Sequence, residues 1–248
     1  MPTTSPTKHN SLNPKQIHIL KMAYKFRFLN APLLAEYKDL KSRHSMYMTL
    51  ELLAKQGYLL RRRDDTPFNN KGIRYGLTSK AFKVLKAESV TSEALKPLYR
   101  NKDVLEDFVD HQVAVLKVFL AIRDQETFHM FCRTELHDFE DFPTPKPDIF
   151  MRRRKQLKTK PNMYFIELWH DQPLFITKKR LKALVAHYDT EWPDSDYPTL
   201  LFVLANERTA KSFQKYADNL LEDLGMDEEI EVQTFTIDKL LECAVSLT

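Results

Sequence analysis

The sequence of 248 residues predicts an α+β protein of two domains. Residues 12–88 read as helices followed by two strand-like runs and a helix, whereas residues 103–248 begin with a long amphipathic helix and continue with mixed strands and helices. The balance of basic and acidic residues also changes between these two parts of the chain. Residues 1–90 contain 17 Lys and Arg against 6 Asp and Glu, and residues 91–248 contain 21 against 28. Residues 1–11 are expected to be a disordered tail, and residues 89–102 a linker that could contain a short helix.

The predicted first domain opens with a strong helix start, because Asn13 can cap, Pro14 suits the first helical position and Gln16 can complete a capping box. The elements expected after it are a short helix from Asn30-Ala31-Pro32, a helix over about 42–56, strands at 58–63 and 72–77, and a helix capped by Thr78. Three helices, a hairpin and a closing helix in this order resemble a winged helix-turn-helix.

A winged helix places its third helix in the major groove and its hairpin, the wing, on the neighbouring backbone. The candidate DNA contacts are therefore the basic residues at the start of that helix and on the hairpin: Lys41, Arg43, His44, Arg61, Arg62, Arg63, Lys71 and Arg74. Neutralised phosphates release counterions, so the pattern predicts salt-dependent affinity for double-stranded DNA. There are two alternatives. The arginine run could be a solvated strand end, or the winged helix could bind a protein instead of DNA.

The predicted second domain runs from a long helix at about 103–124 through strands at 128–132, 148–151 and 163–169, a helix at 177–188, a strand at 199–204, a helix at 209–224, a strand at 230–235 and a helix at 238–245. This order resembles the PD-(D/E)xK nuclease-like fold. The whole chain is thus expected to join a winged helix to an α/β nuclease-like domain.

The nuclease resemblance implies a metal site. Asp148 matches its first acid and Glu167 its second, and such carboxylates hold Mg²⁺, which supplies a nucleophile. The lysine expected two residues after the second acid is replaced by Trp169. Lysines of the following helix could substitute: Lys178, Lys179 and Lys182. Alternatively, the acids are structural and the lysines coat a solvated helix face, in which case no cofactor is expected.

Other features of the sequence limit the classes of function that are possible. Cys132 and Cys243 form no metal-spaced cluster, and two such thiols fit a reducing cytoplasm. The chain shows no membrane-spanning run, no apolar signal segment and no Gly-rich phosphate loop. The basic run 152–160 is either a second DNA anchor or a solvated hairpin tip.

The whole chain resembles the replication-relaxation family of plasmids and integrative mobile elements. The residues that carry the resemblance are Gln16-Ile17-His18-Ile19-Leu20, Phe28-Leu29-Asn30-Ala31-Pro32-Leu33-Leu34-Ala35, Leu50, Leu53, Gly57-Tyr58, Tyr75-Gly76-Leu77-Thr78, His111, Pro147-Asp148, Phe165-Ile166-Glu167, Tyr188 and Trp192. The resemblance implies a DNA-binding accessory factor for replication or mobilisation, whose nuclease-like domain has usually lost or altered its catalytic set. Replication or relaxosome proteins would be its partners.

Three functions stay open at this point. The first is a non-catalytic protein that binds double-stranded DNA, in which the second domain positions DNA, a partner or a second subunit. The second is a Mg²⁺-dependent DNA endonuclease with a displaced lysine. The third is a transcriptional regulator of the element, which would bind a palindromic site as a homodimer or sense a ligand.

Overall fold

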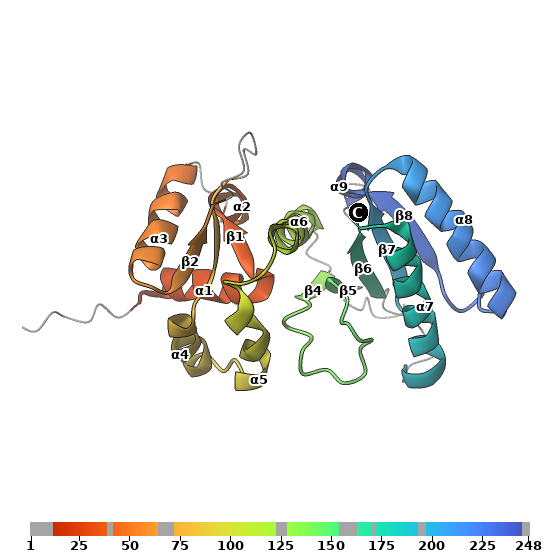
Figure 1. The fold of residues 1–248 in the computed structure, drawn as a ribbon, viewed down its shortest axis with the longest axis horizontal. Coiled ribbons are helices and arrows are strands. Elements are labelled where there is room, and N and C mark those ends of the chain that lie inside the picture. The colour runs from red at the N-terminus through yellow and green to blue at the C-terminus, as the bar shows by residue number, and fades with distance from the viewer. Residues whose placement is uncertain are drawn as a thin grey trace, which may run out of the picture.

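The computed structural model describes residues 12–38, 42–63, 72–122, 128–153, 163–169, 172–192 and 197–244. The tail expected at 1–11, the candidate contacts Lys41 and Lys71, and most of the basic run 152–160 lie outside the described residues. The fold belongs to the α+β class and contains two separate sheets within these ranges (Figure 1). Among the described residues, no helix combines the length and the apolar character that a membrane crossing requires.

The N-terminal unit packs helices around a three-stranded antiparallel sheet of order β1-β3-β2. Its elements are α1 (Pro14–Phe26), β1 (Phe28–Asn30), α2 (Ala31–Tyr37), α3 (Arg43–Lys55), β2 (Leu59–Arg62), β3 (Arg74–Leu77) and α4 (Ser79–Ala87). The predicted capping box is confirmed, since Gln16 N donates to Asn13 Oδ1 at 2.9 Å and Asn13 N donates to Gln16 Oε1 at 3.0 Å. β1 was not expected, because three residues are too few to show a strand pattern.

The segment expected to be a linker is folded. It contains α5 (Ser92–Leu95) and the 3₁₀ helix η1 (Lys96–Arg100). Leu95 and Leu98 are buried in the apolar core, and Asn101 is buried beside them. This segment therefore packs against the N-terminal unit instead of spacing it from the rest of the chain.

The C-terminal unit is built on a five-stranded sheet of order β4-β5-β6-β7-β8. Its elements are α6 (Glu106–Ile122), β4 (Phe128–Cys132), β5 (Ile149–Arg153), β6 (Met163–Trp169), α7 (Leu174–Glu191), β7 (Thr199–Leu204), α8 (Glu207–Leu224), β8 (Val232–Thr236) and α9 (Ile237–Ala244). β4, β5 and β6 pair antiparallel, whereas β6, β7 and β8 pair parallel. Each predicted helix and strand of this region is confirmed to within a few residues.

Alternation along the central strands divides the buried side chains between two cores. On β7, Leu201 and Val203 belong to the core on the α6 face of the sheet, whereas Leu200 and Phe202 belong to the core under α7 and α8. β6 follows the same period, with Ile166 toward α6. Helices thus cover both faces of this sheet (Figure 1).

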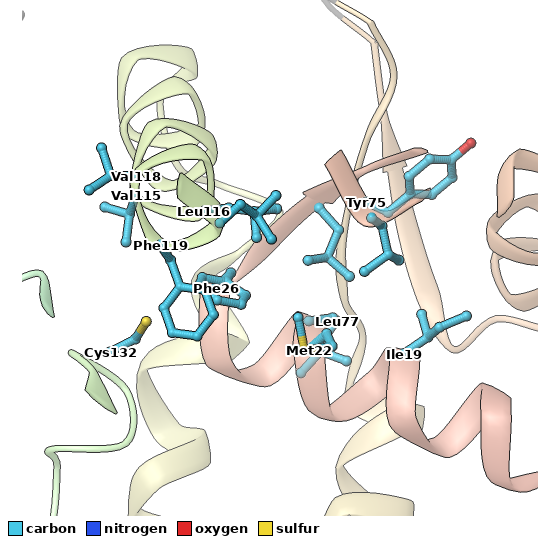
Figure 2. Close-up of a cluster of buried hydrophobic side chains, with 14 of the residues drawn as sticks. Ile19, Met22, Phe26, Tyr75, Leu77, Val115, Leu116, Val118, Phe119 and Cys132 are labelled. Atoms are coloured by element: carbon cyan, nitrogen blue, oxygen red, sulfur yellow. The ribbon is translucent and has the colours of Figure 1, made fainter. Parts of the chain in front are cut away.

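One apolar core joins the two units through α6. Figure 2 shows side chains of α6 reaching toward α1 and β4, and the Phe26 and Phe119 rings meet edge to face with centroids 4.9 Å apart. Cys132 on β4 is buried in the same cluster. The burial of one core on both sides of α6 fixes how the N-terminal unit and the sheet are placed.

Candidate functional site

The two acids singled out in the sequence lie at one end of the β5–β6 pair. Ile149 and Ile166 are register partners on antiparallel strands, so Asp148, the residue before Ile149, and Glu167, the residue after Ile166, come side by side. Both side chains are buried, with 2% of Asp148 and 0% of Glu167 exposed. A buried carboxylate is costly unless cations or donors surround it, so its partners determine what this end of the sheet can do.

Asp148 is held by donors from three other segments. Its Oδ1 lies 2.9 Å from Nε2 of His111 on α6 and 2.9 Å from a guanidinium nitrogen of Arg133, which follows β4. Its Oδ2 accepts the backbone N–H of Leu168 at 2.9 Å. Burial alone would raise the pKa of Asp148, but Arg133, His111 and the Leu168 N–H outweigh it and hold that pKa well below its usual range. Asp148 is therefore an ionised tether between α6, β6 and the segment after β4.

Glu167 is held by a second set of donors. Nε of Arg180 on α7 donates to its Oε1 at 3.0 Å and Nη2 does so at 2.5 Å, while Trp169 Nε1 donates to Oε2 at 3.2 Å. The Arg180 side chain is itself 4% exposed. Burial raises the pKa of Glu167, and Arg180 opposes that rise only in part. Trp169, which stands in the position of the nuclease lysine, thus serves as a hydrogen-bond donor to the neighbouring acid.

These contacts do not fit a bound Mg²⁺. Every oxygen of both carboxylates already accepts a hydrogen bond, and each acid faces a guanidinium, which would repel a divalent cation. No group of three or more His, Cys, Asp and Glu in the described ranges is arranged to hold a metal ion.

The lysines of α7 lie away from the two acids. Lys179 and Lys182 are exposed, and Lys178 places its Nζ 4.2 Å from the Tyr216 ring centroid. The residue of this helix that reaches Glu167 is Arg180, which the sequence reading did not single out. The helical period could have predicted that Arg180 points inward, because it lies on the same stripe as the buried residues Thr177, Leu181 and Leu184.

The arginine run of the hairpin divides between two sides of the small sheet. Arg61 and Tyr75 are register partners, as are Arg62 and Arg74. Arg61 Nε and Tyr75 Oη both bond to Oε1 of Glu51 on α3, at 3.0 and 2.6 Å. Arg61 therefore lies alongside α3, and 41% of its side chain is exposed.

Arg62 and Arg74 turn the other way and hold the start of α6. Arg62 donates to Glu106 Oε1 at 2.5 Å and to the carbonyls of Asn101 and Val104 at 3.1 and 2.9 Å. Arg74 pairs with Glu106 Oε2 and lies 3.6 Å from Asp110, with only 3% of its side chain exposed. These two candidate DNA contacts are therefore internal ion pairs between the hairpin and α6.

The other candidate contacts within the described ranges, Arg43, His44 and Arg63, are exposed. Arg43 and His44 lie in the first turn of α3, and Arg63 follows directly after β2. Arg63 lies two residues beyond Arg61, which contacts α3 through Glu51. These exposed basic residues lie in the first turn of α3 and at the end of the β2 segment, which the Arg61–Glu51 pair joins to α3. The set Arg43, His44, Arg61 and Arg63 is called the basic surface.

No family model matches the sequence, and no curated protein matches it. The described contacts are therefore what supports a function.

Proposed function

We propose that this chain is a DNA-binding accessory protein, in which a winged helix at residues 12–88 docks on double-stranded DNA and a nuclease-like α/β domain serves a non-catalytic role. The observation that carries the proposal is the basic surface of Arg43, His44, Arg61 and Arg63. It combines the exposed start of α3 with one side of the hairpin, which are the two elements that a winged helix applies to a duplex.

The exposed face of α3 suits the major groove. Besides its basic first turn it presents Met48 and Leu52, which are 52% and 45% exposed and lie four residues apart on one side of the helix. Apolar side chains can contact the thymine methyl group, whereas Arg can donate to guanine. Arg61 is held by Glu51 in an exposed pair, and such pairs contribute only about 0–1 kcal/mol, so a phosphate can compete for the guanidinium.

The proposed non-catalytic role of the second domain follows from its acids. Asp148 and Glu167 are each neutralised by a guanidinium of the chain itself, and their oxygens are used by His111, Arg133, Arg180, Trp169 and a backbone N–H. Such a network joins elements of the domain and leaves no carboxylate oxygen for a metal. Together with the resemblance to the replication-relaxation family, this supports a role in replication or mobilisation of a plasmid or mobile element.

The proposal is tested by the salt dependence of duplex binding. Fluorescence anisotropy of a labelled duplex is measured over a salt series for the full chain and for Arg43→Gln/Arg61→Gln/Arg63→Gln. The slope of log K against log salt should become shallower by about 0.9 for each phosphate contact that is lost.

A matched control removes the same charge elsewhere. Arg208→Gln/Lys211→Gln/Lys215→Gln takes three exposed cations from α8, far along the chain from the hairpin. This control should keep the parent slope. Equal slopes for the two triple variants, or no binding by the parent protein, would contradict the proposal.

A further inference from the structure

A cavity of about 360 Å³ lies where the N-terminal unit meets the C-terminal unit. Its wall includes the corner after α1, η1, α6, the segment after β4 and the segment before β5. The size is within the range of pockets that hold small organic molecules. It is distinct from the exposed basic surface of α3 and the hairpin, because it contains none of those four residues.

Arg27 lines this cavity and has no carboxylate partner among the residues that the structure describes. Its guanidinium donates to Asn101 Oδ1 at 2.7 and 3.2 Å and to the Pro97 carbonyl at 3.2 Å, and it lies 4.5 Å from the Phe108 ring centroid. All of these partners are neutral. Burial and, to a lesser extent, the neighbouring cation of Arg133 together lower the pKa of Arg27 to about 10. A half-buried cation is thus left with its charge uncompensated.

In the described part of the chain, four cationic side chains and one carboxylate line the cavity. Arg133 has one carboxylate partner, Asp148, and its Nε donates to the Lys146 carbonyl at 2.8 Å. Lys146 Nζ donates to the carbonyls of Phe139 and Phe142. Lys25 is neutralised by Glu135 at 2.9 Å. Arg27 and Arg133 therefore share one lining carboxylate, Asp148, which His111 also contacts.

The backbone at Arg27 is strained as well. Its φ of 60° with ψ of −47° lies outside the conformations that a residue with a Cβ ordinarily adopts. Such residues cost on the order of 1–3 kcal/mol and cluster at ligand sites, where the surrounding structure holds them in place. In this backbone conformation the Arg27 side chain donates to Asn101 and lines the cavity.

We propose that this cavity binds a small organic anion, with a carboxylate or phosphate group against Arg27 and Arg133 and an apolar body against Phe108 and Val115. The planar guanidinium of arginine can donate two parallel hydrogen bonds to a carboxylate or to a phosphate. The feature common to the possible ligands is therefore an oxyanion, either planar or tetrahedral. The rest of the wall, which includes Ala94 and Pro97, suits an apolar body. This site does not depend on DNA binding.

The test is calorimetric titration of the full chain at constant ionic strength. Phenyl phosphate and benzoate are the two charged probes, and benzyl alcohol is the neutral probe of similar shape. One saturable site is expected for at least one charged probe and none for the alcohol, and the stronger probe identifies the group that the ligand carries. Arg27→Gln should weaken binding by about tenfold or more, since a charge-assisted fork is lost.

The control is Arg208→Gln, which removes one exposed cation from α8 and should leave the affinity unchanged. Absence of saturable binding for both charged probes at millimolar concentration would overturn the proposal, as would equal affinities for the parent and Arg27→Gln. If Arg27→Gln does not fold, a crystal structure of the parent chain with phenyl phosphate decides. An anion on Arg27 and Arg133 supports the site, and an anion elsewhere overturns it.

Discussion

Charged residues lie on or directly beside paired strands in two regions of this molecule, and the partners of these charges differ between the regions. On β2 and β3 the strand period sends Arg62 and Arg74 inward to Glu106 and leaves Arg61 on the α3 side. At the end of β5 and β6, Asp148 and Glu167 are both buried and each is matched by a guanidinium from another element. The first region leaves part of its positive charge exposed at Arg61, whereas the second uses its charge internally.

The comparison shows that the position of a charge in the strand period matters more than the number of charges. A triple arginine suggests three phosphate contacts, but one of the three holds α6 in place. A pair of acids at the end of a sheet suggests a metal site, but both are tethers between helices and strands. Each prediction below breaks one set of these contacts.

The largest effect is expected at the buried pair of Glu167 and Arg180. Arg180→Met leaves Glu167 buried without its cation, so the free energy of unfolding should fall by about 3–5 kcal/mol. Urea denaturation measures it. The exposed neighbour substitution Lys179→Met should change stability by no more than about 0.5 kcal/mol. Adding Glu167→Leu to Arg180→Met should restore most of the lost stability, because it removes the unpaired buried carboxylate. A double variant as unstable as Arg180→Met would contradict this explanation of the loss.

Asp148 should make the protein sensitive to acid. Its folded pKa is depressed, so its contribution to stability is complete above the ordinary Asp pKa of about 3.9 and is lost as the pH falls through the folded pKa. Asp148→Asn removes that contribution, on the order of a few kcal/mol. The variant should therefore be less stable than the parent at neutral pH, and the difference should shrink as the solution is acidified below about pH 4. Urea denaturation at a series of pH values measures this, and a constant difference contradicts it.

Neighbouring residues Arg62 and Arg63 should separate stability from DNA binding. Arg62→Gln removes the bonds to Glu106, Asn101 and Val104 and should lower the free energy of unfolding by about 2 kcal/mol, with little change in the salt slope of duplex binding. Arg63→Gln should leave stability unchanged and reduce the slope by about 0.9. Thermal unfolding and anisotropy on the same two preparations provide the measurement. The opposite assignment of the two effects would refute the proposed sides of the hairpin.

The element order was predictable from the sequence because local signals dominate it. The Asn13 cap, the apolar stripe of α6 and the continuous apolar run of β7 each identify one element without tertiary information. The segment 89–102 was harder, since its short helices have no clear period and are buried by contacts with distant residues such as Arg27.

The partners of the candidate site residues were less predictable, since they come from elements far apart in the chain. Arg133 and His111 meet at Asp148 only because β4 and α6 pack on β5 and β6. The inward turn of Arg62 could have been predicted from strand alternation, since a run of three arginines on a strand must point to two sides. Which side faces α6 depends on the packing of the two units and not on the local sequence.

The smallest expected effect is on DNA cleavage, where the proposal predicts none. Supercoiled DNA incubated with the protein and Mg²⁺ or Mn²⁺ should be shifted on a gel without being cut, because the carboxylates that would hold the metal already bind Arg133 and Arg180. Asp148→Ala and Glu167→Ala serve as controls, provided that each still folds. Cutting by the parent that both substitutions abolish would mean that these ion pairs open to admit a metal, and the second region would then also hold charge for an external partner.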